Sequence, residues 1–269
     1  MKKILITLLA LTPLCLMAQE STKRQQKQEA RKERINKLIK QEEEGALIFQ
    51  KQGAFGIKLN TDGYGIYYEH GRYKSITKTN SWWMELGERK DRKEEKTSPY
   101  PTQLGSLIIL GNPYVFGKEN NFYYFKLGLS QQILIGGKGN KNGVAVSAIY
   151  GGGFSLGMLK PYYIQVQPAN SSTTQDIKYN NNDSVFLDPN VILGASSFGK
   201  GFNEIQFIPG FHAKTALRFD YGRYNEILSA LEVGLNAEYY TKDMPIMVNS
   251  DPKKFFLNAY IAIVFGKRK

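Results

Sequence analysis

The stretch FHAKTALRFDYG (residues 211–222) decides the fold of this chain. Ionisable residues alternate in it with apolar ones, namely His212, Lys214, Arg218 and Asp220 with Phe211, Ala213, Leu217, Phe219 and Tyr221. Successive side chains of a β-strand point to opposite faces, so a pattern with a period of two is typical of a strand. The stretch therefore predicts a strand whose two faces meet different surroundings, one polar and one apolar.

The same alternation recurs along the chain and predicts eight strands. Their expected ranges are 46–60, 64–75, 81–91, 122–135, 143–166, 204–221, 225–241 and 254–266. Several are longer than the ~5–6 residues usual in globular sheets, and a strand needs ~9–11 residues to cross a bilayer obliquely. In lipid every backbone polar group must be paired within the protein, so a membrane-spanning sheet has to close on itself. The pattern predicts an all-β fold, an eight-stranded antiparallel transmembrane β-barrel, over residues 46–269.

The connections between these strands give an independent test. If the mature N-terminus lies in the periplasm, the odd-numbered connections face outward, and three of these four are long: 61–63, 92–121, 167–203 and 242–253. The inward turns are all short: 76–80, 136–142 and 222–223. Long external loops and short periplasmic turns are typical of barrels in Gram-negative outer membranes. The chain is therefore expected in the outer membrane, with both termini periplasmic.

The first 18 residues have the features of a secretory signal peptide. Two lysines precede an apolar run over residues 4–17, and the small residue Ala18 marks the expected cleavage site. The run is shorter than the ~20 residues that a transmembrane helix needs, so residues 1–18 are expected to be removed rather than to anchor the chain. Cys15 is the only cysteine, and it lies in this peptide. Neither disulfides nor thiol chemistry are therefore expected in the mature chain.

Residues 19–45 are predicted to form a short basic periplasmic helix. They contain no Gly or Pro before Gly45, and eight Lys or Arg between Lys23 and Lys40 stand against two Glu. A charge run of this kind usually forms a solvated face, but residues 21–44 are also a candidate docking site for a periplasmic or other envelope protein. The other expected partners are outer-membrane lipids, including lipopolysaccharide. Nucleic acid is not expected for an exported chain.

Three stretches of the chain carry a family resemblance: GGKGNKNGVAVSAIYGGGFSLGMLKPYYI (136–164), FHAKTALRFDYGRYNEILSALEVGLNAEYY (211–240) and FLNAYIAIVFGKRK (256–269). Together they resemble a group of uncharacterised outer-membrane β-barrel proteins of Bacteroidota. The resemblance extends over most of the chain after residue 46, and it implies that location and that fold. It implies no active site, so it transfers no functional residue to this sequence.

Twelve ionisable residues are predicted to point into the barrel as a polar lumen network: Lys58, Glu69, Glu85, Arg89, Lys126, His212, Lys214, Arg218, Asp220, Glu226, Glu232 and Glu238. Six are acidic, five are basic and one is histidine, a balance that favours cross-strand ion pairs. An eight-stranded barrel is only wide enough for its own side chains, so a structural interior is expected rather than a pore. A narrow or gated path for a small solute is the alternative.

His212 and His70 are the two histidines and the candidates for catalysis. Some eight-stranded outer-membrane barrels deacylate or acylate lipid A, and the deacylase type resembles a serine hydrolase with a His-x-Ser arrangement. Here Lys214 stands two positions after His212, and Arg72 two positions after His70, so the serine is missing. No catalytic, cofactor-binding or metal-binding residue is predicted, and a lipid A-modifying enzyme remains an alternative.

The external loops are expected to carry any specific recognition, as loops on a rigid scaffold usually do. The apolar segment 106–110 could form a hairpin with residues 114–117, or raise the strand count to ten. The segment GGKGNKNG (136–143) lacks the Gly-Lys-Ser/Thr of a phosphate-binding loop and is predicted to be a turn. The sequence thus favours a non-enzymatic envelope protein, anchored by the barrel, that binds through its external loops and basic helix.

Overall fold

The computed structural model describes residues 28–29, 31–32, 50–75, 77–99, 102–104, 107–109, 111–139, 143–168, 173–180, 184–222 and 226–269. The predicted signal peptide (1–18) and residues 46–49 of the first predicted strand lie outside the described residues. Within the predicted helix 19–45 the structure describes four residues, all helical and exposed: Gln28, Glu29, Arg31 and Lys32.

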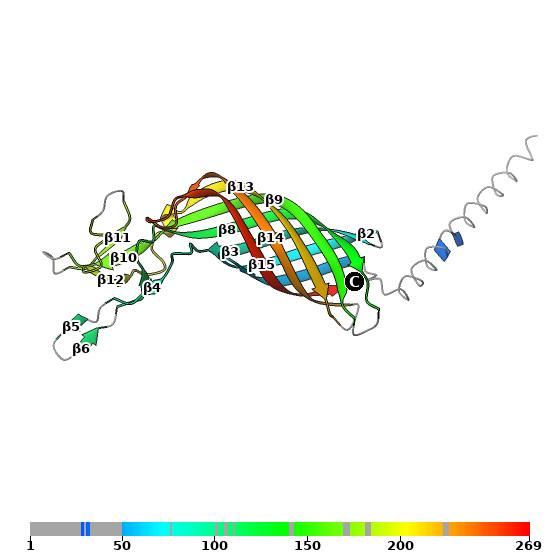
Figure 1. Ribbon diagram of the computed structural model, residues 1–269, viewed down its shortest axis with the longest axis horizontal. Helices are drawn as coiled ribbons and strands as arrows, with labels where there is room; N and C mark the ends of the chain where they lie inside the picture. Colours follow the sequence, from blue (N-terminus) through cyan, green and yellow to red (C-terminus); the bar gives the residue numbers. More distant parts are fainter. Residues whose placement is uncertain are drawn as a thin grey trace, which may run out of the picture.

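Eight antiparallel strands form a closed barrel (Figure 1). In chain order they are β1 (Lys51–Asn60), β2 (Gly63–Ser75), β3 (Lys78–Arg89), β8 (Asn120–Gly136), β9 (Ala145–Pro161), β13 (Gln206–Asp220), β14 (Ile227–Met244) and β15 (Lys253–Arg268). Around the ring their order is β1-β15-β14-β13-β9-β8-β3-β2. The predicted eight-stranded antiparallel barrel is therefore confirmed, and every strand of the ring pairs on both sides.

The ring closes between its first and last strands. Nine residue pairs join β1 to β15, from Gln52 with Arg268 to Asn60 with Tyr260. Two further backbone hydrogen bonds connect Lys51 and Lys269, with N–O distances of 2.8 and 2.9 Å. The C-terminus is thus fixed to the beginning of the barrel.

Most predicted strand boundaries differ from the structure by one to three residues, and two differences change how the chain is connected. β3 begins at Lys78 rather than at residue 81, because residues 78–80 pair with residues 131–133 of β8, and only residues 76–77 remain for the turn. The predicted strand 143–166 divides at Tyr162 into β9 and β10 (Tyr163–Val166), and β10 leaves the barrel. Pro161 has no N–H to donate, so a strand ends there readily.

Seven short strands of the described chain lie outside the ring. β10, β11 (Gln175–Lys178) and β12 (Ile192–Ala195) form a small sheet, and two short pairs consist of β4 (Lys96–Thr97) with β7 (Tyr114–Val115) and β5 (Thr102–Leu104) with β6 (Leu107–Ile109). All lie at one end of the barrel, here called the loop end; the C-terminus lies at the opposite, turn end (Figure 1).

The apolar segment after residue 105 does not form the predicted contacts. Residues 107–109 pair with residues 102–104 and not with residues 114–117, which instead supply β7 to β4. Neither pair joins the barrel, so the possibility of ten barrel strands is wrong.

Large apolar side chains cover the outer face of the barrel. On β3, Trp82, Met84 and Leu86 are 40%, 40% and 51% exposed, whereas Trp83 and Glu85 are each 1% exposed. Other strands repeat this alternation with exposed Phe55, Ile57, Leu59, Ile66, Leu127, Leu129, Phe211, Leu217, Val233, Leu235, Leu257, Ile261 and Ile263. Water-soluble monomers rarely expose a contiguous apolar surface of this extent. Among the described residues, no helix is both long and apolar enough to cross a membrane.

Candidate functional site

The inward faces of the strands hold most of the predicted lumen residues. Eleven of the twelve are at most 7% exposed: Lys58, Glu69, Glu85, Arg89, Lys126, His212, Lys214, Arg218, Asp220, Glu232 and Glu238. Glu226 was predicted to face the lumen as well, but its side chain is exposed. It precedes the first residue of β14, Ile227, so the strand alternation does not extend to it. Five carboxylates and five cations therefore remain inside, with one histidine.

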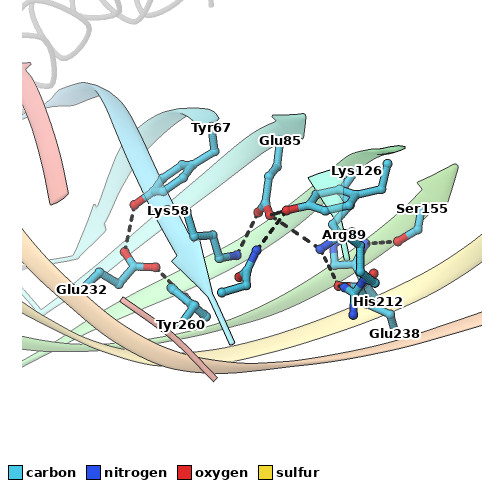
Figure 2. Close-up of polar contacts among 12 residues, drawn as sticks. Lys58, Tyr67, Glu85, Arg89, Lys126, Ser155, His212, Glu232, Glu238 and Tyr260 are labelled. Atoms are coloured by element: carbon cyan, nitrogen blue, oxygen red, sulfur yellow. Dashed lines mark hydrogen bonds and ion pairs between the residues drawn. The ribbon is translucent and has the colours of Figure 1, made fainter. Parts of the chain in front are cut away.

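A chain of alternating charges crosses the lumen near the loop end (Figure 2). Lys58 Nζ donates to Glu85 at 2.9 Å, and Lys126 Nζ lies 3.6 Å from the other oxygen of Glu85. Lys126 also donates to Glu238 at 2.5 Å, and Arg89 Nη2 donates to the same Glu238 oxygen at 2.7 Å. The five side chains come from β1, β3, β8 and β14, so their contacts hold together strands that are not all neighbours in the ring.

Four buried tyrosines add hydrogen bonds to the network: Tyr124 donates to Glu85, Tyr240 to Glu238, and both Tyr67 and Tyr260 to Glu232. The O–O distances run from 2.6 to 3.3 Å. The predicted lumen network contains only acids, bases and histidine, so it leaves these tyrosines out. Their inward positions in the strand alternation are the signal that could have identified them. They satisfy carboxylate oxygens that ion pairs alone would leave without partners.

Arg218 forms the centre of a second cluster, between Glu69 of β2 and Glu232 of β14. Its two terminal nitrogens donate to the two Glu69 oxygens at 2.5 and 2.8 Å. Its Nε and Nη2 donate to Glu232 Oε2 at 2.9 and 2.5 Å. The planar guanidinium fits carboxylates in this bidentate way, so the cluster fixes orientation as well as charge.

A third cluster closes the lumen at the turn end. Arg268 Nη2 lies 2.6 Å from Asp220 Oδ2, and its Nε donates to Gln52 at 3.0 Å. Lys138 Nζ lies 3.5 Å from Asp220 Oδ1 and donates to the carbonyl of Gly222. Lys138 belongs to the glycine-rich segment 136–143, and its contacts join this segment to the end of β13 and the turn after it.

His212 contacts Ser155, a serine on another strand that no local sequence pattern links to it. Its Nδ1 lies 2.9 Å from Ser155 Oγ, although the two residues are 57 positions apart. The imidazole ring lies 4.8 Å from the ring of Trp83, and Lys214 Nζ lies 4.2 Å from the same indole. Strands β13 and β9 are neighbours in the ring, and that pairing brings the two residues together.

The geometry does not equip this pair for hydrolysis of a membrane lipid. Ser155 is 0% and His212 is 7% exposed, and both face the lumen, so a lipid against the outer wall cannot reach them. Within the described part of the chain, Nδ1 of His212 contacts Ser155, and its Nε2 is buried without a hydrogen-bond partner. His70 lies apart from them on β2, with its ring 6.1 Å from that of the outward-facing Trp82. The described part of the chain has no group of three potential metal ligands.

Comparisons with known proteins find similarity only at the level of shape. No family model and no curated protein matches the chain. Neisserial surface protein A matches with a TM-score of 0.36 and 10% identity, over 82% of this chain and 97% of that one. Ail, the attachment invasion locus protein of Yersinia pestis, matches at 0.35 and 7%, over 82% and 100%. A major outer membrane protein from Thermus thermophilus matches at 0.37 and 10%, over 80% and 98%. Likeness this weak carries no weight for location or activity.

Proposed function

We propose that this chain is a non-enzymatic outer-membrane β-barrel protein of a Gram-negative cell envelope, with the barrel as its anchor and the loop end as its binding surface. One observation carries the proposal. The wall exposes large apolar side chains outward, whereas eleven ionisable side chains inside are at most 7% exposed. Such a distribution has a low free energy when hydrocarbon, and not water, surrounds the ring.

The lengths of the connections support an orientation within this proposal. Residues 61–62, 90–119, 162–205 and 245–252 connect strands at the loop end, and residues 76–77, 137–144 and 221–226 connect them at the turn end, so the two long connections, 90–119 and 162–205, both lie at the loop end. Outer-membrane barrels have their longer loops outside the cell and their short turns in the periplasm. We therefore place the turn end, with the C-terminus, on the periplasmic side.

The two adjacent tryptophans test the proposal. Trp82 and Trp83 are the only tryptophans, and they point to opposite faces of β3. In vesicles with brominated acyl chains, Trp82 should be quenched on contact with lipid and Trp83 should not. Trp82→Phe should therefore lose most of the quenching seen in the unchanged protein, and Trp83→Phe should keep it. Equal quenching in both variants, or folded protein that needs no detergent, would contradict the proposal.

Lipids and a periplasmic protein are the partners that we propose. Outer-membrane lipids, including lipopolysaccharide, surround the apolar wall, and the basic segment 21–44 is available for an acidic envelope partner. Affinity capture from outer membranes, with the full chain and with a chain lacking residues 21–44, tests the second interaction. A partner lost specifically with this segment supports it; identical captured proteins contradict it.

The alternative of a lipid A-modifying enzyme has no comparable support. The candidate pair that the described residues offer, His212 with Ser155, is enclosed by the barrel wall. We expect His212→Ala to leave the lipid A of the producing cell unchanged, as measured by mass spectrometry.

A further inference from the structure

The outer face of the wall carries a groove at the loop end, apart from the lumen network. Cross-strand pairing on β2, β3, β8 and β9 aligns four side chains there: Tyr64, Glu88, Tyr123 and Met158. Phe198, Phe202 and Ile205, from the connection between β12 and β13, lie against this row. Together they line an apolar groove of about 480 Å³ that is continuous with the apolar wall of the barrel.

A basic pocket of about 360 Å³ adjoins this groove on its loop side. The two share Tyr64, Glu88, Tyr123 and Phe198. Five lysines line the pocket: Lys90, Lys96, Lys118, Lys160 and Lys200. Glu88 and Glu94 are the carboxylates among its lining residues, so the lining has an excess of three positive charges.

Lys160 is a buried cation of this pocket that has no ion-pair partner among the described residues. It is 2% exposed, and its Nζ lies 4.2 and 4.3 Å from the ring centroids of Phe198 and Phe202. Its one hydrogen bond among the described residues goes to the carbonyl of Phe198, at 2.5 Å. No carboxylate of the described chain lies within ion-pairing distance of Lys160. A buried ammonium without a counter-ion is unfavourable, so an anion in the pocket would stabilise it.

The other lysines divide into two kinds. Lys118 pairs with Glu94 at 2.7 Å, and Lys200 pairs with Asp176. Lys90 and Lys96 are exposed, and the described residues supply no carboxylate partner for either. Three cations of the pocket, Lys90, Lys96 and Lys160, are therefore available to one ligand.

We propose that the basic pocket and the apolar groove together bind one lipid, a glycolipid with two phosphates, in the leaflet next to the loops. The inference rests on the proposed membrane location. Its phosphates would contact Lys90, Lys96 and Lys160, and its acyl chains would follow the groove down the wall. Three free cations match a headgroup of two phosphates better than a single phosphodiester, and the adjoining groove favours a lipid over free phosphate.

Binding can be measured with the detergent-solubilised full chain by native mass spectrometry. The probes are diphosphorylated lipid A, the same lipid without phosphates, phosphatidylglycerol and inorganic phosphate. We expect diphosphorylated lipid A to bind at least about tenfold more tightly than the other three, a difference of about 1.4 kcal/mol, because only this lipid offers two phosphates together with acyl chains. Lys160→Met should remove most of this preference.

Two further variants keep the test informative if Lys160→Met folds poorly. Lys90→Met combined with Lys96→Met changes only exposed side chains of the pocket and should weaken binding of the diphosphorylated lipid by a similar factor. Lys254→Met is the matched control, because Lys254 pairs with Asp243 outside the pocket and should bind as the unchanged protein does.

Equal binding of lipid A with and without phosphates, or of phosphatidylglycerol and lipid A, would overturn the inference. So would unchanged binding in both the Lys160 and the Lys90–Lys96 variants, or inorganic phosphate that binds as tightly as the lipid. Quenching of Trp82 by brominated lipid, measured on the same preparation, separates this failure from failure of the proposed function. A chain that inserts but does not bind refutes only the lipid site.

Discussion

Arg218 stabilises the barrel only as part of a group. Its side chain is 1% exposed, and it contacts Glu69 and Glu232, which are also buried. Removing water from these three charges costs free energy. Their mutual attraction, in a favourable hydrogen-bonding geometry, offsets this desolvation cost. Loss of one member therefore destabilises more than the ion pairs themselves contribute, because the charges left behind stay buried without a partner.

We predict that Arg218→Met lowers the free energy of unfolding by about 3–5 kcal/mol, because Glu69 and Glu232 then both lose their direct ion-pair partner while they stay buried. Urea unfolding in detergent micelles, followed by circular dichroism, measures the change. Arg72→Met, at an exposed position of β2, is the control and should change stability by less than about 0.5 kcal/mol. Equal stability of the two variants would show that the cluster is not needed.

At the residue scale, the sequence predicts which way a side chain points, but not what it meets. Alternation along single strands was enough to place Lys58, Glu85 and Arg218 inside. The contact between His212 and Ser155 depends on how β13 aligns with β9, which no local pattern encodes. The prediction for Glu226 is wrong because it extends the alternation to a residue that precedes the start of β14.

At the element scale, three consecutive glycines, residues 151–153, lie in β9 where it pairs with β8. A Cβ built on Gly153 would lie 2.1 Å from the carbonyl oxygen of Leu127, and one on Gly151 would lie 2.4 Å from that of Leu129. The backbones of β9 and β8 are therefore closer here than any side chain would permit. Glycine within a strand is typical of such close approach and of sharp bends in barrels.

We predict that Gly153→Ala destabilises the barrel by about 1–3 kcal/mol, since the added methyl group must displace the backbone of β8. Gly136→Ala is the matched control at the other end of the β8 pairing, where no atom lies within 4 Å of the added carbon. Urea midpoints of the two variants give the comparison. A Gly153→Ala protein as stable as the control would mean that the strands separate freely at this point.

The sheet of β10, β11 and β12 is a packed unit rather than a loose loop. Ile164, Val166, Phe186 and Ile192 form its buried core with Tyr114. Ion pairs at its edge join Asp176 to Lys200 and Glu204 to Lys178. Hydrogen bonds from these lysines hold the pKa of Asp176 and of Glu204 below their ordinary values. The predicted external loop 167–203 therefore contains two short strands, β11 and β12, although its polar composition is typical of an irregular loop.

The two depressed pKa values predict the pH dependence of this sheet. Each carboxylate contributes stability above its unfolded-state pKa of about 4, and this contribution is lost as the pH falls through the lower, folded-state pKa. Pepsin cleavage within residues 162–205 should therefore increase below about pH 4, while the barrel strands stay intact. Both pairs are partly exposed to solvent, which screens their charges, so we expect a modest effect.

The double variant Asp176→Asn with Glu204→Gln is the control for this experiment. Without these carboxylates, the segment should be cleaved about equally at every pH, after correction for pepsin activity on an unstructured peptide. The same pH dependence in the variant and in the unchanged chain would refute the assignment.

On the scale of the whole molecule, ion pairs between strands lie in the lumen near both of its ends. Arg89 pairs with Asp62 and Glu238 near the loop end, and Asp220 pairs with Arg268 at the turn end. The chain should therefore give no stepwise conductance in planar bilayers, in contrast to a porin measured in the same set-up. Reproducible conductance steps at neutral pH would instead support the alternative of a narrow channel.

The ring itself could be predicted from the sequence, and the architecture of the loop end could not. Eight alternating segments with short and long connections predict a closed antiparallel barrel, because closure pairs the backbone of every strand on both sides. The pairing of residues 107–109 with 102–104, and the position of Phe198 over the wall, depend on packing between loops. Such packing has no periodic signature in the sequence.

Closure between β1 and β15 has a consequence for how the chain folds. Gln52 pairs with Arg268, so the last ladder to form joins segments that are more than 200 residues apart. Contacts of such long range are slow to form, because much loop entropy is lost before they stabilise anything. Until the final strand arrives, both edges of the growing sheet stay unpaired and prone to aggregate. Assembly of this barrel is therefore expected to depend on a holding chaperone, and deletion of β15 should leave no membrane-inserted intermediate.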